Sequence, residues 1–420
     1  MRPSVMNKCV IEPEYFRFHM MAGATSNIPT KKRRLGDNDS LFTDFPQATK
    51  RQLAIKLHDL CDTHGPVWES LKFNNSNAAD ENGGIPFCKA YCSVTASKKK
   101  LFFGAIFVDG LIMMSNFLEQ GIIPSNKPKR LVLGNLLDYI VDFETQAALL
   151  ELESFGEAEL AIVLVNHLLG KLASSTKYII NKHRSGKKLE NCPCSHDCDM
   201  SGTYGDTSIG NELVWHGHLD IIINQDIGVS IVEREDTNEQ SHEEKNPVEV
   251  STSLERNQQI IAQCVVFSFL QRQNRPLSNH FLFPYIGVKG SNLIIYIYDS
   301  EHDVLLQSST IPVLVSNGRN SRPKVNLTAI LVSWLAVNCQ HLSDGLPETL
   351  KSKDKVAEFL LQVKDRIDIY EELLKSGDVG GSIHLGLFSK SEESYEVCPC
   401  GLDEARRKLY EVVWRRTEEG

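Results

Sequence analysis

Two acidic residues on neighbouring predicted strands are the side chains of this sequence best suited to metal chemistry. Asp220 lies in a predicted strand over Glu212–Asn224, and Glu233 lies in the next one, Gly228–Glu235. Because side chains alternate across a strand, the two acids can converge if the strands are antiparallel neighbours. Converging carboxylates repel each other unless a cation lies between them. Oxygen ligands of this kind favour magnesium, which can activate a water to hydrolyse a phosphodiester.

The segments around these acids follow an order that resembles one nuclease superfamily. Asp220 closes the run Gly217-His218-Leu219-Asp220, and Glu233 lies in the run Val229-Ser230-Ile231-Val232-Glu233-Arg234-Glu235. A predicted amphipathic helix, Leu254–Gln273, follows. The pattern resembles the PD-(D/E)XK nucleases, which have a Gly-x-x-Asp motif and an apolar strand ending in Glu-x-Lys. The resemblance covers roughly residues 145–310.

The resemblance implies an α/β fold with a restriction-endonuclease-like core. That core runs helix, three-stranded meander, helix, strand, and helical N- and C-terminal flanks would surround it. Here its elements would be the helix ending near Lys171, the strands around Asp220 and Glu233, the helix Leu254–Gln273 and the strand Asn292–Tyr298. The implied function is metal-dependent hydrolysis of nucleic-acid phosphodiesters, with the two acids as magnesium ligands.

The resemblance also assigns supporting roles to residues on the two core helices. Glu157 or Glu159 on the first helix would supply a further acid. Gln259 or Gln263 on the second would position the substrate strand, and their spacing of four places them on one helix face. The polar face of an ordinary amphipathic helix is the alternative interpretation of the glutamines.

One position departs from the superfamily pattern. Glu235 stands where the superfamily has the lysine that steadies the attacking hydroxide, and a carboxylate adds negative charge where positive charge helps. Arg234 points to the opposite strand face, whereas Arg256 and Lys289 are imaginable replacements. The sequence therefore leaves two functions open. One is an active nuclease, and the other is a catalytically inactive nuclease-fold module that binds nucleic acid or another partner.

A cysteine-rich segment offers a second candidate metal site. Its sequence, Cys192-Pro193-Cys194-Ser195-His196-Asp197-Cys198, places three thiols and an imidazole within seven residues. These are soft ligands that suit zinc, although the spacing differs from paired Cys-x-x-Cys knuckles. Cys398-Pro399-Cys400 could complete a tetrahedral site, and unbound surface thiols are the alternative. The alternating run His216-Gly217-His218-Leu219-Asp220 is a rival transition-metal site.

The rest of the chain divides into predicted regions. Residues 1–44 are predicted to form a mobile basic tail, in which Lys31-Lys32-Arg33-Arg34 is a nuclear import signal, a phosphate contact or a solvated charge run. Residues 45–144 are predicted to contain a helix over Pro46–His64 and a hairpin at Asp109-Gly110. A long helix is predicted over Tyr139–Lys171. The nuclease-like core, 145–310, would include most of it and carry loop insertions at 182–210 and 236–250. Residues 311–420 would be mainly helical.

Composition limits the class of protein. The 420 residues are 41% hydrophobic and 24% charged, which excludes a wholly disordered chain. The net charge of -9 argues against a generally basic nucleic-acid coat but allows a local basic groove. Polar residues interrupt the longest apolar stretches, and a secretory pattern is lacking at the N-terminus. We therefore expect no membrane partner, a nuclear or cytoplasmic location, and cysteines that are thiols or ligands.

Overall fold

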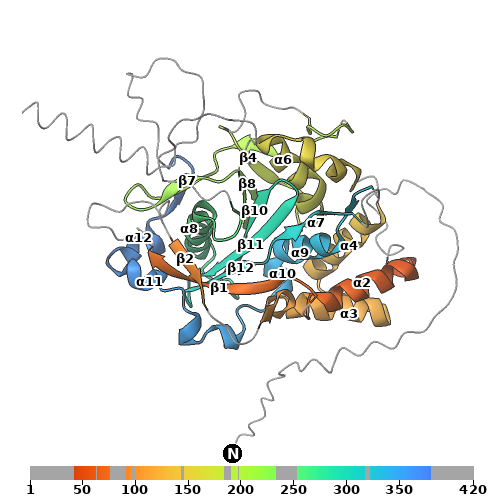
Figure 1. Ribbon diagram of the computed structural model, residues 1–420, viewed down its shortest axis with the longest axis horizontal. Coiled ribbons are helices and arrows are strands. Elements are labelled where there is room, and N and C mark those ends of the chain that lie inside the picture. The colour runs from red at the N-terminus through yellow and green to blue at the C-terminus, as the bar shows by residue number, and fades with distance from the viewer. Residues whose placement is uncertain are drawn as a thin grey trace, which may run out of the picture.

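One large mixed sheet lies between two layers of helices (Figure 1). The computed structural model describes residues 42–62, 64–75, 91–95, 100–142, 146–183, 191–196, 198–232, 253–316 and 322–379. The strands of the large sheet are β1 (Val67–Asn75), β2 (Tyr91–Val94), β3 (Leu101–Phe102), β4 (Tyr178–Asn181), β5 (Thr203–Gly205), β8 (Ile221–Ile223), β9 (Ile227–Ile231), β10 (Leu282–Lys289), β11 (Asn292–Asp299), β12 (Val304–Ser308) and β13 (Ile311–Pro312). Their order is β2-β1-β12-β11-β10-β9-β8-β4-β5, with β3 paired to β1 and β13 paired to β11.

Two smaller sheets and a set of helices complete the fold. The smaller sheets pair β14 (Leu314–Val315) with β15 (Lys324–Val325), and β6 (Ser208–Gly210) with β7 (His216–His218) and β16 (Lys375–Ser376). The α-helices are α2 (Gln47–Asp59), α3 (Val108–Gln120), α4 (Lys127–Val141), α6 (Glu157–Leu164), α7 (Gly170–Leu172), α8 (Gln258–Asn274), α9 (Leu327–Val337), α10 (Cys339–Leu342), α11 (Phe359–Gln362) and α12 (Ile367–Glu372). A π-helical turn, η5 (Val165–Leu169), joins α6 to α7.

The centre of the sheet is a hairpin followed by a crossover. Strands β8 and β9 are antiparallel, with Ile221 opposite Val229, and positive φ angles at Asn224 (52°) and Gln225 (65°) make the turn between them. The chain then passes through α8 and returns as β10, which lies parallel to β9. Such a parallel return needs a crossover, and here α8 supplies it.

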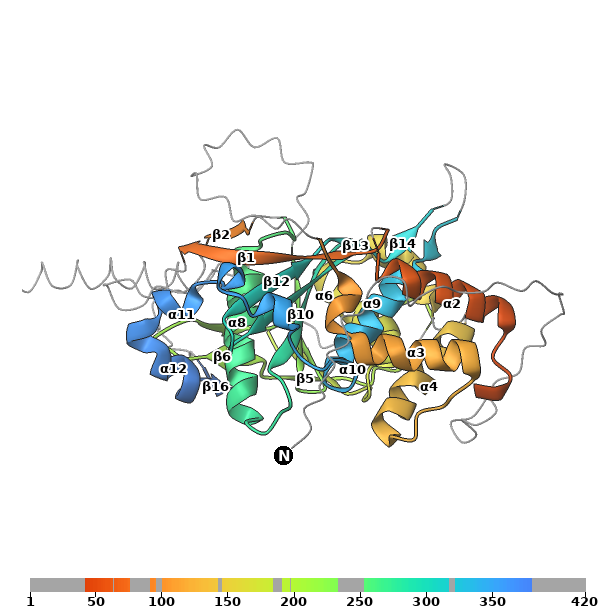
Figure 2. The same ribbon diagram turned by 90° about the horizontal axis from the view of Figure 1, so that it is seen from below.

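Alternation along the strands gives the sheet two different faces. In β11, Leu293, Ile295 and Ile297 belong to one buried cluster, whereas Tyr296 and Tyr298 belong to the other. We call the first the α9 face, because α9 and its neighbours cover it, and the second the α8 face. Figure 2 shows α8, α11 and α12 on one side of the strands and α2, α3, α4 and α9 on the other. Among the described helices, none combines the length and the apolar character needed to cross a membrane.

The structure confirms a mixed α/β protein with helices on both sides of the sheet, but several predicted elements differ. The expected hairpin at Asp109-Gly110 is part of helix α3. Gly110 is needed there for close packing rather than for a turn, since an added Cβ would lie 3.0 Å from Leu335 and Leu342 atoms. The expected long helix over Tyr139–Lys171 is divided: α4 ends at Val141, a 3-10 segment spans Ala148–Ser154, and the extended backbone of Gly156 precedes α6.

Strand β10 was absent from the sequence prediction and lies between α8 and β11. The strand that follows the second core helix is therefore Leu282–Lys289, and Asn292–Tyr298 forms most of the next one. Pro284 and Gly287 concealed this strand, because both residues normally interrupt strand patterns. The division into four regions and the specific restriction-endonuclease-like core stay predictions.

Candidate functional site

Several strands of the large sheet have their carboxyl ends toward the same edge. Strands β4, β5, β9 and β10 run in the same direction and end at Asn181, Gly205, Ile231 and Lys289. Strand β8 runs the other way and begins there, directly after Asp220. We call this edge the carboxyl edge. In open α/β sheets it is the usual location of ligand sites.

Asp220 lies at the carboxyl edge and bonds to the end of β9. Its carboxylate accepts a hydrogen bond of 2.6 Å from the backbone N–H of Ile231, and the side chain is 4% exposed. The carbonyl of Leu219 accepts instead from the Thr207 hydroxyl at 2.5 Å. The Asp220 carboxylate therefore takes the place of a strand carbonyl at the point where regular β8–β9 pairing ends.

A buried polar chain beside Asp220 connects α8 to the sheet. The Ser230 hydroxyl donates to Oε1 of Gln263 at 2.9 Å, and the Ser230 and Tyr285 hydroxyl oxygens lie 2.7 Å apart. Nε2 of Gln263 donates to the carbonyl of His218 at 3.0 Å. Gln263 thus holds the backbone two residues before Asp220, which is a positioning role.

The carboxyl edge also carries charged and imidazole side chains after β4 and β5. Lys182 pairs with Asp206 at 2.8 Å, and the rings of His183 and His218 lie edge to face with centroids 5.1 Å apart. Partial burial opposes ionisation of Asp206, but hydrogen bonds from Lys182 and Ser208 outweigh it and lower its pKa. Burial, followed by the nearby His183, lowers the pKa of His218. The imidazole of His218 is therefore biased toward the neutral form.

Several predicted site residues lie outside the described residues. They are Glu233, Arg234 and Glu235, the basic run Lys31-Lys32-Arg33-Arg34, and the triplet Cys398-Pro399-Cys400. The meeting of Asp220 with Glu233 therefore stays a prediction. That prediction rested on the alternation of side chains along the two strands, and the structure describes the second strand only as far as Val232. In the described part, Val229 and Ile231 of β9 pack on the α9 face, whereas Ile222 of β8, two residues after Asp220, packs against the α8 face.

The helical candidates occupy different environments. Glu157 is partly buried and Glu159 exposed in the first turn of α6, where Oε2 of Glu159 accepts from the Gly156 N–H at 3.2 Å. On α8, Gln259 is exposed, unlike the buried Gln263. The structure therefore does not place the two glutamines in equivalent positions.

The two candidate cations also differ in environment. Arg256 is exposed, with a positive φ of 54°, just before α8. Lys289 is partly buried at the end of β10, directly after Val288, which pairs with Ile231. Of these two cations, Lys289 is therefore the closer in register to the end of β9.

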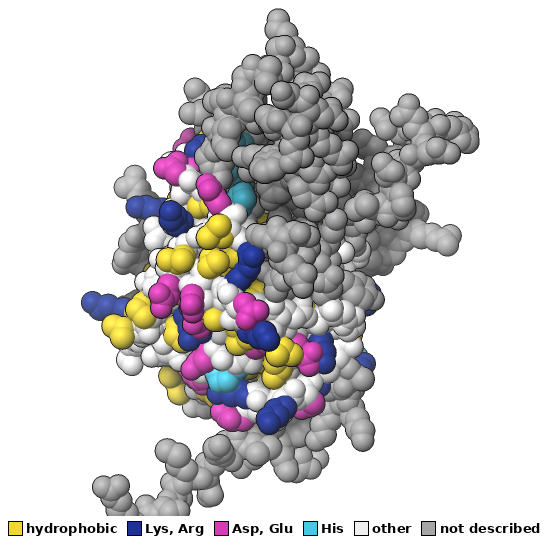
Figure 3. All heavy atoms as spheres, turned by 90° about the vertical axis from the view of Figure 1, so that its left-hand side faces the viewer, with side chains coloured by type: hydrophobic (Ala, Val, Ile, Leu, Met, Phe, Trp, Pro, Cys, Tyr) yellow, Lys and Arg dark blue, Asp and Glu magenta, His cyan; other side chains and the backbone are white. Residues whose placement is uncertain are grey.

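Charge on the outer surface is mixed on the face that carries α11 and α12. Figure 3 shows Lys and Arg side chains interspersed with Asp and Glu over the described part of that face. A long nucleic acid bound mainly by its phosphates needs a continuous basic surface. The described residues of that face do not form one.

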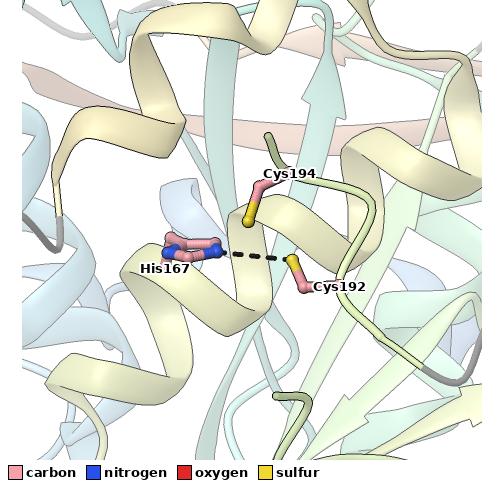
Figure 4. A group of neighbouring side chains, drawn as sticks. All are labelled: His167, Cys192 and Cys194. Atoms are coloured by element: carbon pink, nitrogen blue, oxygen red, sulfur yellow. Dashed lines mark hydrogen bonds between the residues drawn. The ribbon is translucent and has the colours of Figure 1, made fainter. Parts of the chain in front are cut away.

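A second cluster of ligand atoms is buried on the α9 face. His167, Cys192 and Cys194 offer one imidazole nitrogen and two thiol sulfurs, all within 4.8 Å of one another (Figure 4). Nε2 of His167 and Sγ of Cys192 are 3.3 Å apart. Burial raises the pKa of the Cys192 thiol to about 12, so without a metal this thiol is not an activated nucleophile.

The sequence identified part of this cluster. Cys192 and Cys194 were predicted ligands, and the structure brings them together with His167 rather than with His196, which is exposed. Cys198 is partly buried, and its Sγ lies 3.8 Å from the carbonyl of His196. His167 was missed because it stands 25 residues upstream of Cys192 inside an apolar helical run. The structure therefore contains a grouping that can hold a metal.

Two other groups of potential ligands have simpler explanations. Asp299 lies with Glu301 and His302 in the turn after β11, where its Oδ1 accepts from both of their backbone N–H groups. His58, Asp59 and Asp62 lie at the end of α2 or just after it. There Asp62 pairs with His58, four residues earlier, and Asp59 pairs with Lys56, three residues earlier. Ordinary turn and helix-end interactions account for both groups.

Comparison with known proteins adds no assignment. The chain matches no protein-family model, and neither the curated proteins nor the solved structures include one that it resembles significantly.

Proposed function

We propose that this chain is a nuclease-like protein with a restriction-endonuclease-like core, which acts on nucleic-acid phosphodiesters through a magnesium ion held by Asp220 and Glu233. The hydrogen bond from the Ile231 N–H to the Asp220 carboxylate carries the proposal. It puts an acidic side chain against the last residue of β9, two positions before Glu233. The proposal requires the carboxylate of Glu233 to turn toward Asp220.

The chemistry of Asp220 fits a magnesium ligand. A carboxylate has about four lone-pair sites, so the amide of Ile231 does not exhaust its capacity to accept bonds. Magnesium binds in proteins through one or two carboxylates and keeps several waters for substrate phosphates. When bound, it would supply positive charge and an activated water. The fixed backbone at His218, which Gln263 holds, would keep the carboxylate in position.

The proposal needs positive charge near the scissile phosphate, because Glu235 occupies the position of the usual lysine. Arg256 is exposed on the approach to α8 and does not lie in a strand next to β9. Lys289 ends the strand next to β9, one residue beyond the pair formed by Val288 and Ile231. We therefore assign the replacement to Lys289, which would stabilise the charge that develops on the phosphate oxygens.

A second function, a catalytically inactive module on the same core, is favoured by one specific observation. Asp220 and Gln263 both make hydrogen bonds within the chain, and these bonds stabilise the carboxyl edge without any substrate. Residues of a former active site can persist in this way as structural groups. In that case the module would bind nucleic acid or a protein without cleaving it.

Cleavage of nucleic acid by the purified full chain tests the proposal. Single- and double-stranded DNA and RNA would be incubated with magnesium or with a chelator. The variant Asp220→Asn keeps an acceptor for the Ile231 N–H but removes the charge, and we expect it to lower cleavage at least about 100-fold. Asp226→Asn is the matched control. Asp226 is buried on the β8–β9 turn, at the opposite edge of the sheet, and pairs with Arg275 at 3.2 Å.

The outcomes separate the two functions. Magnesium-dependent cleavage that is lost in Asp220→Asn and kept in Asp226→Asn would support the nuclease. An absence of cleavage of every substrate by the folded wild-type chain would overturn it, and fluorescence anisotropy with the same nucleic acids would then test the binding module. Equal losses in both variants would assign Asp220 a structural role only.

A further inference from the structure

We propose that His167, Cys192 and Cys194 bind one zinc ion, which links the cysteine-rich segment to the π-helical turn η5 between α6 and α7. This site is separate from the carboxyl edge and does not rest on the proposed nuclease activity. Its residues come from two places in the chain: the π-helical turn η5 and the segment that follows the 184–190 interval.

The composition of the cluster selects the type of metal. Two thiol sulfurs and one imidazole nitrogen are soft or borderline ligands, which suit zinc and not magnesium or calcium. All three side chains are at least nine-tenths buried, with exposures of 4% for His167, 4% for Cys192 and 7% for Cys194. Burial shields the site from competing water and is typical of a structural ion.

The distances between the ligand atoms match one tetrahedral ion. Zinc bonds of about 2.3 Å to sulfur and about 2.0 Å to nitrogen keep tetrahedral ligand atoms roughly 3.5–3.8 Å apart. The Nε2 atom of His167 and Sγ of Cys192 are 3.3 Å apart, and all three ligand atoms lie within 4.8 Å of one another. Figure 4 shows both sulfurs directed toward the imidazole ring. Binding the ion requires the three ligand atoms to adjust to these separations.

The π-turn that carries His167 is an independent sign of a built site. Single π-turns inside helices are rare and occur frequently at functional sites. Asn166, the preceding residue, accepts from the Tyr178 hydroxyl at 3.0 Å and donates to the carbonyl of Asp199 at 3.2 Å. Of these two consecutive residues of the turn, His167 therefore contacts the cysteine-rich segment, and Asn166 holds Asp199, the residue directly after it.

Cys198 is the described residue best placed to supply a fourth ligand. The N–H of Cys192 donates to the carbonyl of Cys198 at 3.0 Å, next to an antiparallel bridge between Asn191 and Asp199. This bridge puts Cys192 directly opposite Cys198. Residues in that relation have side chains on the same side and Cβ atoms about 4.5–5.5 Å apart. Rotation about χ1 can then turn the Cys198 sulfur toward the ion and complete a Cys₃His set.

Metal analysis of the full chain, purified without chelators, tests the site. Inductively coupled plasma mass spectrometry should find about one zinc per chain. Cobalt in its place would show thiolate-to-metal charge transfer and the intense visible bands of tetrahedral coordination. His167→Gln, Cys192→Ser and Cys194→Ser should each lower zinc affinity at least about tenfold. Cys198→Ser should lower it as well, and its failure to do so would remove Cys198 from the ligand set.

Two matched variants control for loss of a histidine or a thiol alone. His196→Gln removes the exposed imidazole of the same segment, and Cys339→Ser removes a fully buried thiol of α10 on the same face. Both should keep wild-type zinc content. Where a ligand variant fails to fold, the cobalt spectrum of the wild-type chain decides. Wild-type protein that has neither zinc nor a cobalt–thiolate band would overturn the proposal, as would zinc loss in His196→Gln with full retention in His167→Gln.

Discussion

The two faces of the central sheet are stabilised by different chemistry. On the α8 face, buried tyrosines bond to polar partners: the Tyr298 hydroxyl donates to Asp303 at 2.9 Å, and the Tyr296 hydroxyl donates to the Leu254 carbonyl at 2.6 Å. On the α9 face, Ile295 and Ile297 of β11 belong to one apolar cluster with helix α9, whose residues from 329 to 337 are all buried.

This difference indicates how each face determines the fold. Apolar packing is non-directional and tolerates rearrangement, as long as volume is conserved. A buried polar network is directional, and each partner left unsatisfied costs free energy. The α8 face therefore fixes the positions of α8 and the β8–β9 hairpin, which bear the candidate site. The α9 face carries the larger of the two buried apolar clusters, together with the proposed zinc cluster.

The largest effect should follow from a cavity on the α9 face. Leu331→Ala removes a fully buried side chain of α9 and should lower the free energy of unfolding by about 2–5 kcal/mol. Urea unfolding measures the change. Leu361→Ala is the matched control, because Leu361 is 66% exposed on α11 and its loss should change stability little. A cost below about 1 kcal/mol for Leu331→Ala would mean that this face is loosely packed.

An intermediate effect should distinguish the α8 face by its dependence on pH. Burial raises the pKa of Asp303 to about 6 from a usual value of 3.8, although the Tyr298 hydroxyl and two backbone N–H groups oppose the shift. A carboxyl whose folded pKa is raised contributes stability that is complete below pH 3.8 and is lost as pH rises through about 6. The loss between pH 4.5 and 7.5 should be on the order of 2 kcal/mol.

The variant Asp303→Asn isolates this contribution. Its amide oxygen can still accept from the Tyr298 hydroxyl, but it does not titrate. Burial lowers the pKa of His280, which gives stability the opposite trend over the same pH range, and this term is common to both proteins. The difference in unfolding free energy between wild type and variant should therefore change with pH. A difference that is constant from pH 4.5 to 7.5 would show that Asp303 has an ordinary pKa.

The sequence predicted elements best where one periodicity was undisturbed. The helix expected over Leu254–Gln273 is α8, and the strands expected at Asn292–Tyr298 and Val304–Gln307 are β11 and β12. Long-range packing caused the errors. Gly110 looked like a turn residue because its close contact with α10 is invisible in the local sequence, and β10 was hidden by Pro284, which the sheet accommodates opposite Ile297.

The candidate site was predictable only in part, for a related reason. Asp220 stands at the carboxyl edge, but its bond to Ile231 depends on where regular β8–β9 pairing stops. Gln263 was predicted to position the substrate strand, whereas in the structure it bonds to the Ser230 hydroxyl and the carbonyl of His218. His167 had no local signal, because a histidine in an apolar helix is usually a packed core residue. Each of these contacts joins segments that are distant in sequence.

The smallest effect should come from the serine at the centre of the polar chain. Ser230→Ala removes a hydroxyl that lies 2.7 Å from the Tyr285 hydroxyl and 2.9 Å from Gln263. Both partners are on the same side of the sheet, so the tyrosine hydroxyl and the glutamine amide can shift toward each other and recover part of the loss. We therefore expect unfolding free energy to fall by about 1 kcal/mol, within the usual range for one hydrogen bond. Ser268→Ala is the control, since the Ser268 hydroxyl donates a single bond of 2.7 Å to the carbonyl of Tyr298 on the same face.

The double variant Ser230→Ala with Gln263→Met tests whether the polar chain acts as one network. If it does, the loss of unfolding free energy in the double variant should be smaller than the sum of the losses in the two single variants. Additive costs would instead show that the α8 face is held by independent bonds, and the contrast with the apolar face would then be one of composition rather than of cooperativity.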